Sequence, residues 1–447
     1  MSSTDRRATL PAVHRLVDDV HAAGLDRHHP HNVIVGAIRD VLATARAHDG
    51  REPPGGWVAA VCSRLERTAQ PSLIRVINAS GVVLHTNLGR APLARRAVAA
   101  MQEAAGYCTL EYDVAIGERG SRQDHIRALC REVTGAEDAV FVNNAASALV
   151  LVLNALAQGG ETIVSRGELV EIGGAFRIPE ILGKSGSVLV EVGTTNRTRL
   201  RDYEAALSPR TRAALKVHRS NFQIRGFQSE ASVSDLTTLF GKRSITTIHD
   251  VGSGLLVDLE PWGLRGEPLV RHSVTSGAIV VCSTDKLVGG PQGGLILGPA
   301  EWIDRIRTNP FARAFRPDKM VVAGFAETLA IYRDHNQALQ EIPILRMLTQ
   351  EPAVIRERAN RLATLIAGAR LEEGQSAVGG GAFPESELST TIVAVPTSHV
   401  DGVLDRLRLG TPPIIARAGE DAVLLDPRTL ADADIETVSR AVATARK

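Results

Sequence analysis

The spacing of apolar residues predicts a helical segment at the start of the chain. In LPAVHRLVDDVHAAGL (residues 10–25) and NVIVGAIRDVLATAR (residues 32–46), apolar side chains recur every three or four positions, which is typical of amphipathic helices. The break AHDGREPPGG (residues 47–56) is rich in glycine and proline, and a third helical pattern, WVAAVCSRLERTA, follows it. We therefore expect residues 1–68 to form a small helical domain.

Beyond residue 70 the pattern changes to short apolar runs that alternate with helical stretches. The runs VFV (140–142), LVEV (189–192) and IVV (279–281) are continuously apolar, as expected for strands buried on both faces of a sheet. Strands that alternate with helices predict a mainly parallel sheet with crossover helices. We assign residues 69–335 to this α/β domain and residues 336–447 to a smaller α+β domain.

Composition agrees with a globular protein of more than one domain. With 447 residues the chain is too long for one ordinary core, and its 44% apolar and 23% charged residues are ordinary values. The net charge of +1 gives no overall attraction to nucleic acid or membrane, although it leaves a local basic face open. Four scattered cysteines without a C-x-x-C pair predict neither a disulfide framework nor a metal site. The N-terminus lacks the apolar core of a signal peptide and no apolar run approaches a membrane span, so we expect a cytoplasmic protein.

The stretch VVCSTDKLVGGPQGGLILG (residues 280–298) places Lys286 between an apolar strand and a glycine-rich turn. Only six of the 51 basic residues are lysines, so a lysine here suggests a need for an amine that can lose its proton. Ligands bind beyond the carboxyl ends of strands in an open parallel sheet, and a buried lysine with a lowered pKa can form a Schiff base there. The alternative is an ordinary surface lysine in a loop.

Two other predicted strand ends carry groups that pyridoxal 5′-phosphate (PLP) requires. Asp250 ends the strand SITTIHD, where an acid can keep the pyridine nitrogen of PLP protonated. After the strand VFV, Ala145, Ala146 and Ser147 lead into a helix N-terminus, whose backbone N–H groups can bind a phosphate. Each feature alone is more often a turn former or an ordinary helix cap.

Further polar residues complete this predicted site. Ser283 lies three residues before Lys286 and can reach the same phosphate, and Gln292 lies in the turn that follows. The run KVHRSNF ends another strand, so His218 or Asn221 can contact the phenolic oxygen of the cofactor. Four strand ends with a phosphate cradle, a polar contact, an acid and a lysine, in that order, predict a PLP enzyme. The turn has no G-x-x-x-x-G-K-[ST] pattern, so a P-loop is not supported.

In these motifs the chain resembles the bacterial selenocysteine synthases, the L-seryl-tRNA(Sec) selenium transferases, which are fold-type-I PLP-dependent enzymes. The resemblance runs from about residue 71 to 332 and is carried by INASGVVLHTNLGRAPL, VNNAASALVLVLNAL, SRGELVEIGGAFRIPEI, EVGTTNRT, KVHRSNF, DVGSGLLVDL, DKLVGGPQGGLILG and RAFRPDKM. The N-terminal arm is similar as well. Thr284 stands where the family is expected to have glycine, and Ser147 where it usually has alanine, and neither change removes a needed group.

The resemblance implies roles for individual residues. It assigns Lys286 as the Schiff-base lysine and Asp250 as the partner of the pyridinium nitrogen. It also places Arg90, Arg313 and Arg316 at the substrate pocket, where guanidinium groups suit the phosphate of selenophosphate. Spacing alone would make Arg313 and Arg316 a pair on a helix surface.

The resemblance also implies the reaction and the partners. The serine carried by seryl-tRNA(Sec) would lose its β-hydroxyl and then accept selenium from selenophosphate, which gives selenocysteyl-tRNA(Sec). The family implies a homo-oligomer, a decamer built from dimers. Glu171 or a neighbour is the candidate for stacking on the cofactor ring.

Other functions stay open from the sequence. A PLP-dependent β-eliminase or lyase that acts on a free amino acid or sugar acid would not need the N-terminal arm. A tRNA-binding protein on a decayed PLP fold would bind no cofactor. Residues 1–68 have nearly balanced charge and a concentration of histidines, so both tRNA binding and a packing role are open for the arm; the histidines are His14, His21, His28, His29, His31 and His48.

Overall fold

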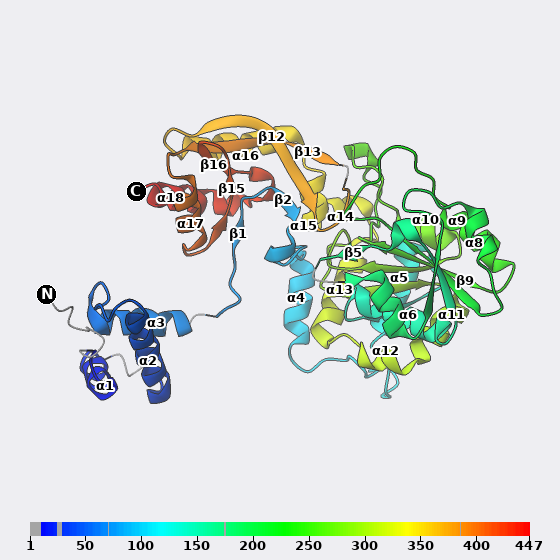
Figure 1. Cartoon of the computed structure of the whole chain (residues 1–447), viewed down its shortest axis with the longest axis horizontal. Coiled ribbons are helices and arrows are strands. Elements are labelled where there is room, and N and C mark those ends of the chain that lie inside the picture. Colours follow the sequence, from blue (N-terminus) through cyan, green and yellow to red (C-terminus); the bar gives the residue numbers. More distant parts are fainter. Residues whose placement is uncertain (1–9, 25–28, 70, 174–175, 385) are drawn as a thin grey trace. The chain divides into compact units, whose positions relative to one another are not determined.

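The structure, a computed structural model, describes residues 10–24, 29–69, 71–173, 176–384 and 386–447 (Figure 1). The chain divides into two compact units, Met1–Arg75 and Val76–Lys447. His28 of the N-terminal arm lies outside the described residues, as do Gly174 and Ala175 of the motif SRGELVEIGGAFRIPEI.

The first unit contains the three predicted helices, α1 (Val13–Ala22), α2 (His31–Ala47) and α3 (Gly56–Ala69). Their apolar residues lie three or four positions apart, so they share one face of each helix and meet in a common core. This core includes Leu16, Val20, Ile34, Ile38, Leu42, Val61 and Leu65. The helical prediction is confirmed, and the unit extends to Arg75, beyond the predicted boundary at residue 68.

The second unit is built around a seven-stranded sheet with the strand order β3-β11-β10-β9-β8-β4-β7. Strands β10, β9, β8, β4 and β7 run parallel, whereas β11 runs antiparallel to both of its neighbours. The mainly parallel sheet predicted from the sequence is confirmed. Its strands are β3 (Asp138–Val142), β4 (Glu161–Ser165), β7 (Val188–Val192), β8 (Thr211–Val217), β9 (Thr246–Gly252), β10 (Ile279–Ser283) and β11 (Gly294–Gly298).

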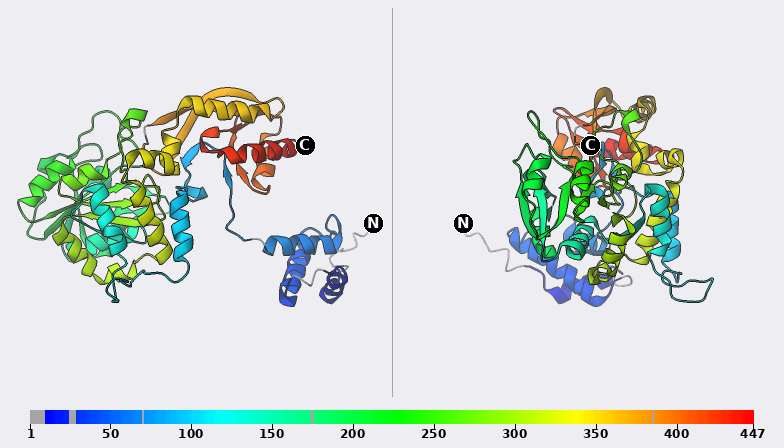
Figure 2. Two further views of the ribbon diagram at one scale, coloured as in Figure 1. Left: turned by 180° about the vertical axis from the view of Figure 1, so that it is seen from behind. Right: turned by 90° about the vertical axis from the view of Figure 1, so that its right-hand side faces the viewer.

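Helices cover both faces of this sheet, which explains the continuously apolar strand sequences (Figures 1 and 2). Successive residues of a strand point to opposite faces, so Val280 and Val281 of β10 belong to two different cores. The core of Val281 includes residues of α6 (Ala145–Ala157), α7 (Ile178–Ser185) and α11 (Ala300–Thr308). The core of Val280 includes residues of α4 (Arg95–Ala104), α5 (Asp124–Thr134), α10 (Val270–Thr275) and α13 (Lys319–Ile331).

Shorter elements connect or flank these layers. Two of them, α8 (Leu200–Ala205) and α9 (Val233–Gly241), pack on a separate core with Ile163 and Ala214. The others are η3 (Thr86–Leu88), η4 (Arg166–Glu168), β5 (Glu171–Ile172), β6 (Phe176–Arg177), η5 (Glu260–Trp262), α12 (Pro310–Ala314), α14 (His335–Glu341) and α15 (Pro343–Leu348).

A second sheet, with the order β15-β16-β13-β12-β2, forms what we call the small subdomain of this unit. Its helices and strands surround a separate apolar core that includes Val393, Val395 and Val423. Its C-terminal elements are α16 (Pro352–Thr364), β12 (Arg370–Gly379), β13 (Glu387–Pro396), α17 (Val400–Arg408), β14 (Ile414–Ile415), β15 (Arg417–Ala418), β16 (Ala422–Leu425), η6 (Pro427–Thr429), η7 (Asp432–Asp434) and α18 (Ile435–Ala445).

The small subdomain also takes two strands from the beginning of the unit. Strand β1 (Ile77–Asn78) pairs with β14, and β2 (Val82–Leu84) pairs in parallel with β12. We predicted that this segment belongs to the α/β domain. Strands of two and three residues leave no periodic pattern that identifies their partners, so these pairings could not be predicted. The predicted boundary between residues 335 and 336 stays a prediction, since both sides belong to one compact unit.

Within the described part of the chain, no helix combines the length and the apolar character needed to cross a membrane.

Candidate active site

Asp250 and Lys286 lie at the carboxyl ends of two adjacent parallel strands, β9 and β10. Each residue is only 7% exposed. Burial raises the pKa of Asp250 from an ordinary 3.8 to about 6, and the nearby Lys286 and the Gly252 N–H oppose this rise. Burial also lowers the pKa of the Lys286 amine, and Asp250 opposes that shift. The pair therefore combines a buried acid with an amine that loses its proton more easily than an ordinary lysine.

The glycine-rich turn after Lys286 is held by hydrogen bonds within itself and to the strand ends. The Thr284 N–H donates to the Gly293 carbonyl at 3.0 Å, and the Thr284 hydroxyl donates to the Pro291 carbonyl at 2.5 Å. The Leu287 N–H donates to the Ser253 carbonyl at 3.0 Å, which ties the lysine segment to the segment after Asp250. The Thr284 hydroxyl thus contributes a bond that a glycine at this position could not make.

Arg90 reaches the site through Asp285, the neighbour of Lys286. Its Nη1 donates to Asp285 Oδ2 at 2.8 Å, and the Ser283 hydroxyl donates to the other carboxylate oxygen at 2.5 Å. Arg90 and Gln292 line one cavity of about 550 Å³ together with Asp285. The structure therefore brings Arg90, Ser283 and Gln292 to the lysine segment. Sequence reasoning missed Asp285, whose role depends on an arginine almost two hundred positions away in the chain.

The predicted phosphate turn is the N-terminus of α6, as expected. Asn144 caps the helix, since its side-chain oxygen accepts from the Ser147 N–H at 2.8 Å. The amides of Ala145 and Ala146 belong to the first turn, where a helix supplies no backbone acceptor of its own. The turn lies close to β11, because a Cβ on Gly294 would lie 2.1 Å from the Asn144 carbonyl oxygen.

His218 joins this group, whereas Asn221 is engaged elsewhere. The His218 N–H donates to the Asp250 carbonyl at 2.9 Å, so β8 delivers the imidazole beside the acid. The Nε2 atom of His218 is buried without a hydrogen-bond partner among the described residues and lies 3.4 Å from Glu267 Oε2. Asn221 is exposed and donates from its side chain to the Glu171 carbonyl at 2.8 Å, while the Glu171 carboxylate pairs with Arg177.

Arg313 and Arg316 lie in and just after α12 and are exposed. Their segment is fixed to the phosphate turn, because the Asn143 N–H donates to the Phe315 carbonyl at 2.8 Å. The Arg122 guanidinium holds the same segment through the Pro317 carbonyl at 2.5 Å. Within the described ranges, neither Arg313 nor Arg316 has a hydrogen-bond or ion-pair partner for its guanidinium, so both are available to an anion.

This arrangement fits PLP. An acid, a lysine, a helix N-terminus and an imidazole come from the ends of β9, β10, β3 and β8. Asp250 suits the pyridine nitrogen, Lys286 the aldehyde, and the amides of Ala145 and Ala146 with the Ser147 hydroxyl suit the phosphate. The individual roles of these residues, and those of Ser283, His218, Asn221 and Gln292, stay predictions. Among the described residues no cluster of three or more metal-ligating side chains is found.

Comparisons with known proteins identify similar chains over nearly the whole length. The family model described as L-seryl-tRNA selenium transferase matches residues 76–431. The L-seryl-tRNA(Sec) selenium transferase of Solidesulfovibrio magneticus is 47% identical over an alignment that covers 96% of this chain and 95% of the relative. That of Geobacter sulfurreducens is 44% identical and covers 97% of this chain and 98% of the relative.

Among solved structures, that of D-glucosaminate-6-phosphate ammonia-lyase aligns with a TM-score of 0.59 and 21% identity, covering 84% of this chain and 96% of that chain. This likeness concerns the fold. The chain has the α/β architecture of fold-type-I PLP-dependent enzymes, as predicted.

Proposed function

The chain belongs to the L-seryl-tRNA selenium transferase family, and from this premise we propose that it converts seryl-tRNA(Sec) into selenocysteyl-tRNA(Sec) with PLP and selenophosphate. The observation that carries the proposal is the buried pair of Asp250 and Lys286 at adjacent strand ends. This pair has the chemistry that PLP needs, and it lies in a chain that matches its relatives over almost their full length.

PLP, when bound, supplies an electron sink for the α-carbon of the seryl group. Asp250 keeps the ring nitrogen protonated, and the α6 N-terminus with Ser147 binds the phosphate. His218 contacts the cofactor beside Asp250, because its backbone is bonded to the Asp250 carbonyl. The described residues would thus hold the cofactor at its ring nitrogen, at its phosphate and through a polar contact with His218.

Lys286 holds the cofactor at rest and moves a proton during the reaction. Its Nζ is the group placed to remove the α-proton of the seryl residue, and an amine must be neutral to do so. The depressed pKa of Lys286, caused first by burial, favours that neutral form. The β-hydroxyl then leaves as water with the proton that Lys286 took from the α-carbon. The selenium of selenophosphate adds to the β-carbon while a proton from solvent adds to the α-carbon, and water cleaves the P–Se bond to release phosphate.

Three arginines bind the phosphate of selenophosphate in this proposal. Arg90 is oriented by its ion pair with Asp285 at 2.8 Å, directly beside Lys286. Arg313 and Arg316 sit on the segment that the phosphate turn holds through Phe315. Guanidinium groups bind phosphate oxygens by paired, charge-assisted hydrogen bonds, so the three can orient the selenium donor toward the β-carbon.

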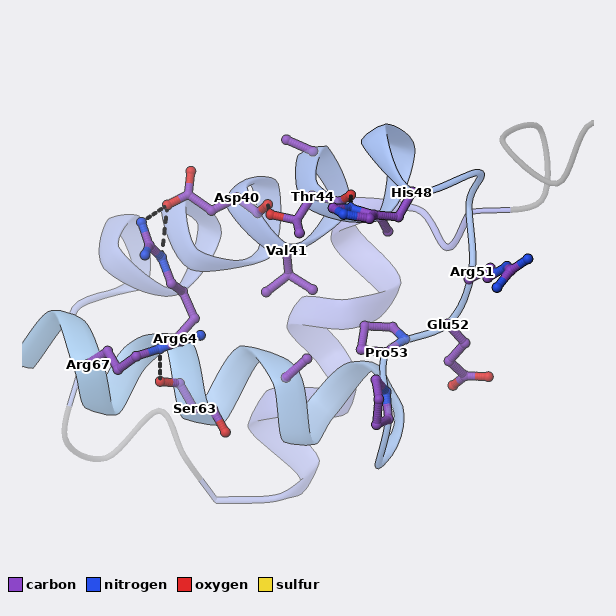
Figure 3. Close-up of a pocket in the computed structure, with 14 residues that line it drawn as sticks. Asp40, Val41, Thr44, His48, Arg51, Glu52, Pro53, Ser63, Arg64 and Arg67 are labelled. Atoms are coloured by element: carbon purple, nitrogen blue, oxygen red, sulfur yellow. Dashed lines mark hydrogen bonds and ion pairs between the residues drawn. The ribbon is translucent and has the colours of Figure 1, made fainter. Parts of the chain in front are cut away.

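We propose that the first unit binds the tRNA. Between α2, α3 and the loop that joins them lies a cavity of about 850 Å³ (Figure 3). Four of its lining residues, His48, Arg51, Arg64 and Arg67, carry basic side chains, against Asp40 and Glu52. Arg64 is fixed by Asp40 at 2.6 Å and Arg67 by the Ser63 carbonyl at 3.1 Å, so both guanidinium groups are held by residues that line the cavity. Such ordered arginines suit the phosphate backbone of RNA.

The proposal includes a homo-oligomer, a decamer as the family implies, and a cytoplasmic location, where charged tRNA is used.

The deciding experiment supplies the purified protein with seryl-tRNA(Sec), without and with selenophosphate, and identifies the esterified amino acid by mass spectrometry. We expect selenocysteine only when selenophosphate is present, and none with Lys286→Ala. Lys242→Ala, which removes an exposed lysine, is the matched control. An unchanged seryl ester from a protein that nevertheless binds PLP would overturn the proposal in favour of a lyase that acts on a free small molecule.

A further inference from the structure

Glu267 is a buried carboxylate that the proposed chemistry does not use. It lies ahead of α10 and its side chain is 0% exposed. The Ser253 hydroxyl donates to its Oε1, and the Phe383 N–H donates to its Oε2 at 2.8 Å. His218 Nε2 lies 3.4 Å from the same Oε2. A buried carboxylate is costly unless donors surround it, so the two hydrogen bonds from Ser253 and Phe383 stabilise Glu267 in this position.

Two of these neighbours lead directly to residues of the active site. Ser253 follows Asp250 by three positions, and its carbonyl accepts from the N–H of Leu287, the residue after Lys286. His218 is bonded through its N–H to the Asp250 carbonyl. Glu267 therefore contacts the segments that carry the acid and the imidazole, and Ser253 links it to the lysine segment.

The third neighbour belongs to the small subdomain. Phe383 lies in the loop between β12 and β13 and has a φ of 47°, a left-handed conformation that is costly for a residue other than glycine. The same loop packs against Leu84, because a Cβ on Gly380 would lie 2.8 Å from the Leu84 side chain. Leu84 begins the segment that ends at Arg90. The bond from Phe383 to Glu267 thus fixes a loop that lies between the Arg90 segment and His218.

We propose that Glu267 is a positioning residue of the active site, whose carboxylate locks the loop 379–383 onto the ends of β8 and β9 and thereby orients the His218 imidazole toward the cofactor. The inference rests on the proposed function, because it takes PLP as the group that His218 contacts. A carboxylate is needed because an amide in its place could accept hydrogen bonds through only one of its two side-chain atoms.

The test is a double-mutant cycle read by PLP affinity, measured from the absorbance of the bound cofactor. The proteins are the parent, Glu267→Gln, His218→Asn and the double variant. We expect each single change to raise the Kd for PLP by about tenfold, the size of one lost charge-assisted bond. If Glu267 acts through His218, the double variant is also weakened by about tenfold, and not by the hundredfold of independent effects.

A second readout is independent of the cofactor. Hydrogen exchange of the peptide that contains Phe383 should be faster in Glu267→Ala, because the Phe383 N–H loses its acceptor. Ser253→Ala, which removes only one donor, keeps the test open if Glu267 variants do not fold, and should raise the Kd by about threefold. Glu260→Gln, an exposed acid that lines the same cavity as Glu267, is the control and should change neither readout.

Additive effects in the cycle, or an unchanged Kd in Glu267→Gln, would overturn the inference. Faster hydrogen exchange at Phe383 with an unchanged Kd for PLP would likewise overturn the positioning role, because Glu267 would then only hold the loop in place. A parent protein that binds no PLP would overturn the proposed function together with this inference. Binding of PLP that depends on Lys286 but not on Glu267 would overturn this inference alone.

Discussion

Burial favours the neutral forms of both ionisable groups at the centre of the site, and each group partly restores the charge of the other. The pKa of Asp250 is raised to about 6 and that of Lys286 is lowered, in both cases first by desolvation. An acid that binds its proton more tightly can share it with a pyridine nitrogen, and an amine that releases its proton can act as a nucleophile and base. Burial of the two strand ends therefore contributes to the chemistry, because it shifts the pKa values of both groups.

The first prediction concerns the amine of Lys286. Lys286→Ala should lose the visible absorbance of a Schiff base and lower turnover by at least about 10³-fold, as expected when a base and covalent anchor is removed. Lys286→Arg should fail equally, because arginine stays protonated. Absorbance spectra and selenocysteine formation measure the two effects. Turnover by Lys286→Arg within about tenfold of the parent would contradict the role of a neutral amine.

The second prediction is a pH dependence of stability set by Asp250. Its folded pKa of about 6 lies above the ordinary 3.8, so between these values the folded state binds more protons than the unfolded state. Stability contributed by this group is therefore fully present below about pH 4 and is lost as pH rises through 6. The loss is about 3 kcal/mol, because one pH unit corresponds to about 1.4 kcal/mol.

Asp250→Asn removes this titration. Denaturant unfolding of the cofactor-free protein at equal concentration should show that the variant gains about 3 kcal/mol relative to the parent between pH 4 and pH 7. Asp258→Asn, at an exposed carboxylate of the segment after β9, is the matched control. A constant difference between Asp250→Asn and the parent across this range would show that Asp250 is not protonated in the folded state at pH 5.

Among single residues, the sequence predicts the location of those that directly follow a recognisable strand. Lys286 and Asp250 follow apolar runs, so their place at the carboxyl edge of the sheet can be predicted. Asp285 and Glu267 cannot be found in this way, because their roles come from partners distant in sequence, Arg90 and Phe383. These contacts depend on how distant segments pack in the folded chain, and no local sequence pattern predicts that packing.

At the scale of elements, the antiparallel strand β11 sets the position of the phosphate turn. It pairs with β3 along its whole length, and Gly294 lies opposite Val142, just before the turn that begins α6. A Cβ on Gly294 would lie 2.1 Å from the Asn144 carbonyl oxygen and 2.9 Å from the Ala145 nitrogen. These are backbone atoms at the helix N-terminus, so they cannot move aside without displacing the amides that would bind phosphate.

The third prediction follows from this contact. Gly294→Ala should lower the free energy of unfolding by about 1–3 kcal/mol, as expected for overpacking, and should weaken PLP binding as well. Thermal unfolding and a PLP titration measure the two effects. Gly183→Ala in α7 meets no atom within 4 Å and is the control, which should be neutral or slightly stabilising. Normal PLP affinity in Gly294→Ala would show that the α6 N-terminus does not hold the phosphate.

Helices and strands could be predicted where burial produces a long run of apolar residues, and could not be predicted where the element is too short to show one. The central strands are continuously apolar because helices cover both faces, so their parallel arrangement could be predicted. Strand β2 has three residues, and its partner β12 lies almost three hundred positions further along. Pairing of that kind is decided by packing of the small subdomain on Leu84, and short strands carry too few residues to reveal it.

At the scale of the whole molecule, the chain combines a unit that has the groups for PLP chemistry with a helical unit that has none of them. Each unit has apolar cores of its own, and among the described residues the core of α1–α3 consists of residues from the first unit. Size and helical periodicity predicted this division, whereas the balanced charge of the first unit gave no prediction of its partner. The structure adds the grouping of Arg51, Arg64 and Arg67 around one cavity, which requires the turn between α2 and α3.

The last prediction separates the two units. A protein of residues 76–447 should fold and bind PLP with a Kd within about threefold of the parent, because all groups assigned to the cofactor lie in this unit. It should lose selenium transfer to seryl-tRNA(Sec), since the proposed contacts to the RNA backbone lie in residues 1–75.

In the full chain, replacing Arg51, Arg64 and Arg67 by glutamine should weaken tRNA binding and lower its salt dependence by about one ion per lost phosphate contact. Binding titrations at several salt concentrations measure this slope, and Arg39→Gln, on the same helix as Asp40 but outside the cavity lining, is the control. Full tRNA affinity in the triple variant, together with loss of activity on truncation, would assign the first unit a role in packing and would move the RNA contacts to residues 76–447.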